Sequence, residues 1–359
     1  MIKPFTKYEK YRGERSPHLA AACDITRFGI SAVLYDKALS RRFARTVFWG
    51  EELTAGSIIP QLSRIVSSSL RQYGVSAAEV EDIGFAAPVY LTGILEELSP
   101  DSLFLSPDVN MTVLPFVSAE IGGRFTACLA AAPLEEGTLI ADFGGTLCAA
   151  VFAGGALTCA SAGLKGAFDG SAIESGMTGE TGAADSISRE PDGTLCYSVA
   201  GDGDSMGLSP AAVLNAAVLM RGEGIIDEDG IMTDRDLFYI GEDFYISQSD
   251  IRAVQSDKAL AGATLSLLLG KTGEPWHAYL SGEPLAGDGL RSLVRLGVVP
   301  EKLAAIAGFC RNSAEQGIIN CLCDRALYER VCALAYSAED ITAELSDRRD
   351  ELYFDRLAF

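Results

Sequence analysis

The sequence has little of several features on which common classes of function depend. Its 359 residues include only two histidines, His18 and His277, so Ser-His-Asp triads and His-based metal sites have almost no material. Gly, Asp or Glu interrupts every apolar run before it reaches the roughly 18 residues of a membrane span. Residues 1–15 lack the apolar core of a signal peptide. These absences predict a cytoplasmic protein.

Cysteine motifs with the usual spacing are also missing. The nine cysteines are odd in number and many lie in apolar stretches, as Cys128 and Cys148 do, which favours reduced thiols over a disulfide framework. One residue separates Cys321 from Cys323, whereas thioredoxin and zinc motifs have two. Two interpretations of these thiols remain: a metal site that Cys332 completes, or small buried apolar groups.

Positive charge is scarce, because 29 Lys and Arg stand against 49 Asp and Glu, a formal net charge of −20. A protein of this sign repels phosphate backbones and anionic lipids, which argues against nucleic acid and membrane partners and favours a basic partner. The exception is a basic tail at residues 1–17, which we interpret either as a docking arm or as a solvated chain end. Its charges come from Lys3, Lys7, Lys10, Arg12 and Arg15.

With 48% hydrophobic residues, a chain of this length can form two lobes with sizeable cores. Hydrophobic patterning predicts the following elements in the first half: strands at 19–25, 29–35, 43–48 and 83–87, and helices at 58–73, ending at Gly74, and at 121–132. It predicts these in the second half: strands at 138–143, 148–152, 156–160 and 277–280, and helices at 210–221, 250–269 and 312–323. This restarted pattern indicates an α/β fold with two related lobes, at residues 18–133 and 134–359.

The clearest repeat is an aspartate at the end of an apolar strand, just before a turn, which occurs at Asp24 and at Asp142. Gly144 and Gly145 follow Asp142. Glycine lets a phosphate approach backbone N–H donors, and the carboxylate can hold Mg²⁺ directly or through water. The residues after Asp24 are larger, so we expect that turn to grip phosphate less well. A tight hairpin without ligand is the alternative interpretation of both turns.

Two further turns contain polar residues suited to a nucleotide. In the Gly-rich segment 162–170, Lys165 can pair with phosphate and Asp169 can polarise water. The turn at 280–287 contains Gly282, but Pro284 removes a backbone donor there. An ordinary inter-strand loop and an ordinary strand-to-helix turn remain the alternatives.

Several of these segments together resemble a known family. Residues 138–145, 167–177, 224–230 and 246–258 are similar, in order and spacing, to the C-terminal domain of the reductive activators of corrinoid-dependent enzymes. Residues 83–88 and 114–123 look like the first lobe of the same domain. The resemblance implies the two-lobed actin-like ATPase fold, which is ribonuclease H-like, with a duplicated β-hairpin and phosphate loop. Members of that family use ATP to help re-reduce cob(II)alamin on a partner corrinoid protein.

The resemblance also implies roles for particular residues. Asp24 and Asp142 would position Mg²⁺, and Asp142 and Asp169 would act in catalysis, Asp169 by holding or activating water. The residues that would contact ATP are Asp24, Thr26, Arg27, Asp142, Gly144, Gly145, Thr146, Lys165, Gly166 and Gly282.

Three departures from the family pattern weaken this expectation. The sequence has no Cys-rich segment before His18, so we expect no iron–sulfur cluster in it. Thr26, Arg27 and Phe28 replace the small residues of the first phosphate loop, and Glu283 with Pro284 alters the third turn. Each lost backbone bond to phosphate costs about 1 to 3 kcal/mol, so two would weaken binding by roughly 10² to 10⁴.

The leading hypothesis is therefore an accessory protein that binds a corrinoid protein or a corrinoid methyltransferase component, with weak ATP binding or hydrolysis. A non-enzymatic docking module with a degenerate nucleotide cleft is the first alternative, and a small-molecule kinase of the same superfamily is the second. The sequence leaves the oligomeric state open, a homodimer included.

Overall fold

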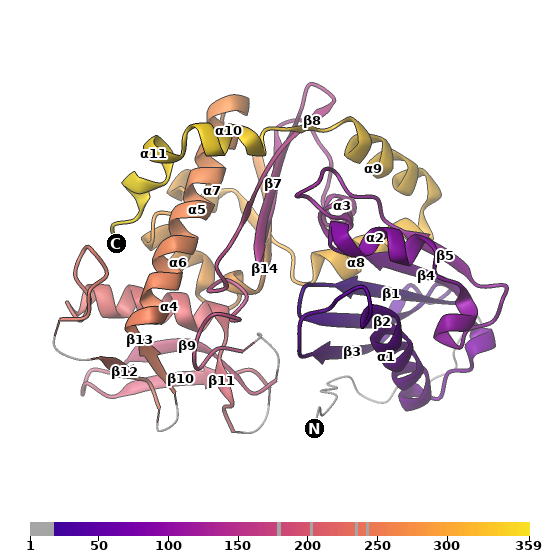
Figure 1. Cartoon of the computed structure of the whole chain (residues 1–359), viewed down its shortest axis with the longest axis horizontal. Coiled ribbons are helices and arrows are strands. Elements are labelled where there is room, and N and C mark those ends of the chain that lie inside the picture. Colours follow the sequence, from indigo (N-terminus) through magenta and orange to yellow (C-terminus); the bar gives the residue numbers. More distant parts are fainter. Residues whose placement is uncertain (1–17, 178–180, 202–203, 234–235, 242–243) are drawn as a thin grey trace. The chain divides into compact units, whose positions relative to one another are not determined.

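The structure is a computed structural model that describes residues 18–177, 181–201, 204–233, 236–241 and 244–359 (Figure 1). The basic tail at residues 1–17 lies outside these residues. The chain divides into two compact units. Unit 1 extends to Leu134 and includes Asn312–Ala338, whereas unit 2 comprises Glu135–Arg311 and Glu339–Phe359. We describe each unit by itself.

Unit 1 is built on a five-stranded sheet in the order β3-β2-β1-β4-β5. β1 pairs antiparallel with β2 and parallel with β4, β2 pairs antiparallel with β3, and β4 pairs parallel with β5. Its elements are β1 (Leu19–Ile25), β2 (Gly29–Asp36), β3 (Arg41–Trp49), α1 (Ile58–Tyr73), β4 (Val80–Ala86), α2 (Val89–Glu96), β5 (Asn110–Val113), α3 (Gly123–Ala131), α8 (Ser313–Cys323) and α9 (Arg325–Ser337).

Apolar patterning explains the central elements of unit 1. Every residue of β1 is buried, as expected of a strand with neighbours on both sides. α1 buries Ile58, Leu62, Ile65 and Leu70 at helical spacing and packs against β2 and β3 (Figure 1). It ends at Gly74, whose left-handed backbone caps the helix as predicted.

α8 and α9 belong to unit 1, although they follow most of unit 2 in the sequence. The sequence-based boundary between the two lobes, at residues 133 and 134, assigns these two helices to the second lobe instead. Glu315 at the start of α8 is 1% exposed and accepts hydrogen bonds from Arg45 Nε at 2.7 Å and Arg42 at 3.3 Å, and it also contacts Ser31. This buried ion cluster fastens α8 to β2 and β3, a contact between residues far apart in the chain.

Unit 2 repeats the sheet of unit 1. Its six-stranded sheet has the order β15-β14-β6-β7-β8-β16, so β8-β7-β6-β14-β15 reproduces β3-β2-β1-β4-β5, with the same parallel and antiparallel pairs. The strands are β6 (Thr138–Phe143), β7 (Thr146–Ala153), β8 (Ala156–Gly163), β14 (His277–Gly282), β15 (Ala307–Phe309) and β16 (Glu339–Asp340). The predicted α/β fold with two related halves is confirmed.

Unit 2 also contains smaller sheets and several helices. A three-stranded sheet has the order β10-β9-β11, and β12 pairs with β13. These elements are β9 (Ala183–Arg189), β10 (Leu195–Val199), β11 (Gly207–Leu208), α4 (Pro210–Gly222), β12 (Leu237–Tyr239), β13 (Tyr245–Ser247), α5 (Gln248–Thr272), α6 (Gly289–Arg295), α7 (Glu301–Ala305), α10 (Thr342–Asp347) and α11 (Arg349–Leu352). The long helix α5 packs against β7 and β8 (Figure 1).

None of the helices within the described part of the chain is both long enough and apolar enough to cross a membrane. α5 spans 25 residues, but charged and polar residues such as Asp250, Asp257 and Lys258 interrupt its apolar content.

Candidate functional site

The turn between β6 and β7 is the best-formed candidate site in unit 2. Asp142 lies near the end of β6, is 4% exposed, and accepts a hydrogen bond of 2.6 Å from the Ser281 hydroxyl. β14 lies parallel to β6 and places Ser281 opposite Asp142. The carboxyl ends of parallel strands are where ligands bind in open α/β sheets.

The two glycines of this turn present backbone donors. Gly144 and Gly145 are partly exposed and lie between the two strands. Within the described residues, no protein group accepts a hydrogen bond from the N–H of Gly144 or Gly145. Two neighbouring donors of this kind can bind an anion such as a phosphate oxygen. Thr146, the first residue of β7, is exposed beside them.

Asp169 belongs to the same site. A Cβ atom at Gly145 would collide with Asp169 Oδ2, so this carboxylate lies directly against the turn. Its other oxygen, Oδ1, accepts hydrogen bonds from the Ser171 N–H at 2.9 Å and the Ser171 hydroxyl at 2.6 Å. The fold therefore brings Asp142 and Asp169 to one turn, although 26 residues separate them in the sequence.

Gly282, the last residue of β14, lies against the end of β6 next to the site. It has φ +117, and a Cβ atom there would overlap the carbonyl oxygen of Phe143. Only glycine permits this close approach between the ends of β14 and β6. Pro284 is buried in the turn that follows.

The loop that contains Lys165 and Gly166 differs from its predicted use. Its backbone donors face the protein interior, where the N–H groups of Lys165 and Ala167 both bind the carboxylate of Asp257, the second at 2.8 Å. Burial, with a smaller contribution from the charge of Asp169, raises the pKa of Asp257 to about 6, although these hydrogen bonds lower it. These two N–H groups are thus engaged by Asp257, while the Lys165 side chain is exposed.

The corresponding turn of unit 1 is arranged differently. Asp24 at the end of β1 is 8% exposed and forms an ion pair of 2.9 Å with Arg124 Nε from α3. The Thr26 N–H and hydroxyl both donate to the Gly29 carbonyl, at 2.8 and 3.2 Å, which closes the turn on itself. A cation thus already neutralises the carboxylate at which a metal was expected.

Arg27, at the tip of the same turn, pairs within unit 1. Its Nε lies 2.8 Å from Glu52, and its guanidinium stacks over the Phe28 ring at 5.1 Å. The hydrogen bond from Arg27 lowers the pKa of Glu52. Because both side chains are well exposed, this ion pair contributes little to stability.

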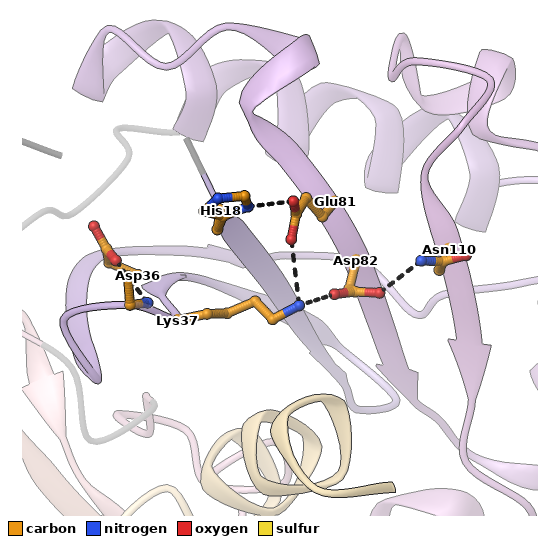
Figure 2. A network of polar contacts seen from close by, with 7 residues as sticks. His18, Asp36, Lys37, Glu81, Asp82 and Asn110 are labelled. Atoms are coloured by element: carbon orange, nitrogen blue, oxygen red, sulfur yellow. Dashed lines mark hydrogen bonds and ion pairs between the residues drawn. The ribbon is translucent and has the colours of Figure 1, made fainter. Parts of the chain in front are cut away.

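A separate polar network lies at the opposite, amino end of β1 and β4 in unit 1 (Figure 2). Lys37 binds Asp82 and lies 3.4 Å from Glu81, His18 binds Glu81, and Asn110 donates to Asp82 at 3.0 Å. Burial alone would lower the pKa of Lys37, but its acidic neighbours outweigh burial and raise that pKa. Opposite charges compensate one another here, so we assign this network a structural role.

No group of three or more His, Cys, Asp or Glu that could hold a metal ion occurs among the residues that the structure describes. Mg²⁺ commonly uses only one or two carboxylates and takes its remaining ligands from water and phosphate. Asp142 beside two open backbone donors has the chemistry of such a site.

Three contributors to these turns escaped the sequence-based prediction. Ser281 lies in a segment that the sequence singled out, but its bond to Asp142 depends on strand order. Asp257 lies inside the segment 246–258, which was singled out only for its similarity to the family, and no role was predicted for Asp257 itself. Arg124 carries no signal of its own, because its partner Asp24 lies 100 residues earlier.

A family model describing the C-terminal domain of RACo, the ASKHA domain, matches residues 136–359. Comparison with curated proteins found no match.

Among solved structures, one similar chain is a reductive activator for corrinoid, iron-sulfur protein, with a TM-score of 0.82 and 16% identity over 96% of this chain. This chain spans 66% of the length of that activator. At such identity the match shows a shared fold.

Two further solved structures are more distant. The ethanolamine utilization protein EutJ from Carboxydothermus hydrogenoformans gives a TM-score of 0.41 at 10% identity, covering 87% of this chain and 91% of its own. A ROK hexokinase from Thermus thermophilus gives 0.34 at 17% identity, covering 84% and 96%.

Proposed function

The chain belongs to the family of C-terminal ASKHA domains of RACo, and from this premise we propose that unit 2 binds the phosphates of Mg²⁺-ATP at the turn after β6. The observation that carries the proposal is the pair of open N–H groups at Gly144 and Gly145, flanked by Asp142 and Asp169. Donors and carboxylates in this arrangement suit a phosphate and its cation.

Each residue of the turn has a distinct part in this proposal. Gly144 and Gly145 donate to phosphate oxygens, and Asp142, oriented by Ser281, holds Mg²⁺ directly or through water. Asp169 keeps Oδ1 on Ser171 and directs Oδ2 toward the turn, where it can orient a water molecule. Bound Mg²⁺-ATP supplies the free energy of phosphoryl transfer, and we expect a slow ATPase.

We further propose that the partner is a corrinoid protein, or a corrinoid methyltransferase component, which this chain helps to return to its reduced state. The support is the family together with the name of the similar activator, which acts on a corrinoid iron–sulfur protein. Electrons for such a reduction would come from another protein or domain.

Isothermal titration with Mg²⁺-ATP tests the nucleotide part. We expect heat of binding from the unaltered chain and a loss of affinity of about 100-fold in Asp142→Asn, since a charge-assisted contact is worth roughly 1.5 to 3 kcal/mol. Glu301→Gln removes an exposed acidic charge on α7 and is the matched control. Absence of binding at millimolar nucleotide would refute this part.

A second candidate function is a docking module that needs no nucleotide. It is favoured by unit 1, where Arg124 neutralises Asp24 and the Thr26 donors close on Gly29. Capture of a purified corrinoid protein with equal affinity in the presence and absence of ATP would support this module. Capture that Mg²⁺-ATP strengthens, and that Asp142→Asn makes insensitive to ATP, would support the leading proposal.

A further inference from the structure

Helix α5 carries two fully buried aspartates, Asp250 and Asp257, both within the segment 246–258. They are seven residues apart, which is about two helical turns, so they lie on the same side of the helix roughly 10 Å from each other. Buried carboxylates are costly unless hydrogen bonds compensate them. The groups that donate hydrogen bonds to these two carboxylates therefore indicate their role.

Both aspartates hold the same segment of unit 2. Asp257 binds the N–H groups of Lys165 and Ala167, and Asp250 accepts a hydrogen bond of 2.9 Å from the Glu174 N–H. Asp250 also caps its own helix by accepting from the Ser247 N–H at 2.8 Å. One rigid helix thus fastens the start and the end of residues 165–174.

Asp169 lies between the two fastened ends. Gly166 turns the chain with φ +102 and packs closely against Ser171 and Ala172. Ser171 in turn holds Asp169 Oδ1, and Asp169 Oδ2 lies against Gly145. With both ends and the middle fixed, the carboxylate of Asp169 has one defined place beside the turn.

We propose that Asp257 and Asp250 are positioning residues that clamp the 165–174 loop to α5 and thereby set Asp169 against the Gly144–Gly145 turn. The inference rests on the proposed nucleotide site for its functional meaning, whereas the clamp itself is a property of unit 2 alone. Asp257 is the more important of the two, because it accepts hydrogen bonds from two N–H groups at the start of the loop, whereas Asp250 accepts one at its end.

The chemistry requires a carboxylate at residue 257. Both of its oxygens accept a backbone N–H, Oδ1 from Lys165 and Oδ2 from Ala167. An asparagine has the same shape but only one accepting oxygen, and its NH₂ group would face an N–H donor. Asp257→Asn should therefore release one end of the loop without changing the volume of the core.

Hydrogen exchange measured by mass spectrometry on the full chain tests the clamp. In Asp257→Asn we expect amides of residues 165–168 to exchange at least ten-fold faster, since a hydrogen bond to a charged group is worth about 1.5 to 3 kcal/mol. Peptides of β6 and β7 should keep their protection. Ser256→Ala, a neighbouring change on α5 away from the loop, should leave the loop unchanged.

Titration of Mg²⁺-ATP between pH 5 and pH 8 supplies a second measurement. In the unaltered chain, the affinity for Mg²⁺-ATP should change with pH as Asp257 titrates, and Asp257→Asn should lack this change. At pH 7.5 the variant should bind Mg²⁺-ATP at least ten-fold more weakly. The nucleotide phosphate titrates in both chains, so the difference between the two curves isolates residue 257. Ser171→Ala should weaken affinity while leaving exchange at 165–168 unchanged, because it removes only the hydroxyl bond to Asp169 Oδ1 and keeps the bond from the Ser171 N–H.

The outcomes separate the two proposals. Faster exchange in Asp257→Asn, with no nucleotide bound by any chain, supports the clamp and refutes the nucleotide site. Unchanged exchange at 165–168, in a variant that folds, overturns the clamp whatever the nucleotide does. Should Asp257→Asn fail to fold, Asp250→Asn is the substitute, and unchanged exchange at Glu174 in that variant would likewise overturn the clamp.

Discussion

The turns after β1 and β6 occupy equivalent positions in the five strands that the two sheets share, yet their aspartates have different partners. Strand pairing places Ala86 opposite Asp24 and Ser281 opposite Asp142. The side chain of alanine cannot donate a hydrogen bond, and in unit 1 Arg124 supplies the donor instead. The neutral Ser281 hydroxyl orients Asp142 without cancelling its charge.

The same strand arrangement therefore supports two different turn chemistries. In unit 1 an arginine stands where a metal cation would be useful, and the turn closes on itself through Thr26 and Gly29. In unit 2 the glycine donors remain open beside a carboxylate that a hydroxyl holds in place. The proposed phosphate site therefore belongs to unit 2, and unit 1 retains the architecture with altered chemistry.

The largest effect should follow from adding a side chain at Gly282, where β14 and β6 of unit 2 approach each other. Gly282→Ala forces a side chain onto the Phe143 carbonyl at φ +117, so we expect it to destabilise unit 2 by about 3 to 5 kcal/mol. Each unit contains one tryptophan, Trp49 or Trp276, so urea unfolding of Gly282→Ala in a Trp49→Phe background reports on unit 2. Gly308→Ala is the control, because its added Cβ meets only ordinary contacts, and an equal loss there would contradict the account.

A smaller loss should follow in unit 1 when the cation is removed. Arg124→Met removes the ion pair between Arg124 and the buried Asp24 carboxylate, and we expect about 2 kcal/mol of destabilisation after allowing for the partial exposure of Arg124. Trp49 fluorescence during urea unfolding of a Trp276→Phe chain measures it. Adding Asp24→Asn should restore most of the lost stability, and failure of that rescue would show that the ion pair is not the cause.

The pH dependence of stability should set unit 2 apart from unit 1. The pKa of Asp257 rises on folding from an ordinary value of 3.8 to about 6, so the folded state binds the proton more tightly. Its contribution stabilises unit 2 at low pH and is lost as pH rises through about 6. We expect roughly 1 to 2 kcal/mol more stability at pH 5 than at pH 7, relative to Asp257→Asn. Equal pH profiles for the two chains would count against this assignment.

The smallest loss of stability should follow from the substitution that makes unit 2 resemble unit 1 at a single side chain. Ser281→Ala reproduces the alanine found opposite Asp24 and removes the hydrogen bond to Asp142. We expect a loss of about 1 kcal/mol in urea unfolding followed by Trp276. Ser292→Ala, another buried serine of unit 2, serves for comparison. No change at all in Ser281→Ala would mean that the hydroxyl does not support the carboxylate.

Much of the fold could be predicted from local pattern. The strand at 138–143 and the helix at 58–73 were predicted with the bounds that the structure gives them, because continuous apolar runs and helical spacing are local signals. The short, half-exposed strands β9 and β10 had no comparable signal, and they were not predicted.

The site was harder to predict than the strands. Asp142 and its glycines stand out because strand, aspartate and turn are contiguous in the sequence. The bonds that decide their chemistry join residues far apart, such as Asp257 with Lys165 and Arg124 with Asp24. Nothing in a local pattern says that the N–H groups of a glycine-rich loop face a buried carboxylate rather than a phosphate.

The most direct test of the central claim is a crystal structure of the chain grown with Mg²⁺-ADP. We expect phosphate oxygens within hydrogen-bond distance of the Gly144 and Gly145 N–H groups, with Mg²⁺ held by Asp142 directly or through one water. A nucleotide whose phosphates contact Thr26 to Phe28 and leave the Gly144–Gly145 turn untouched would contradict it.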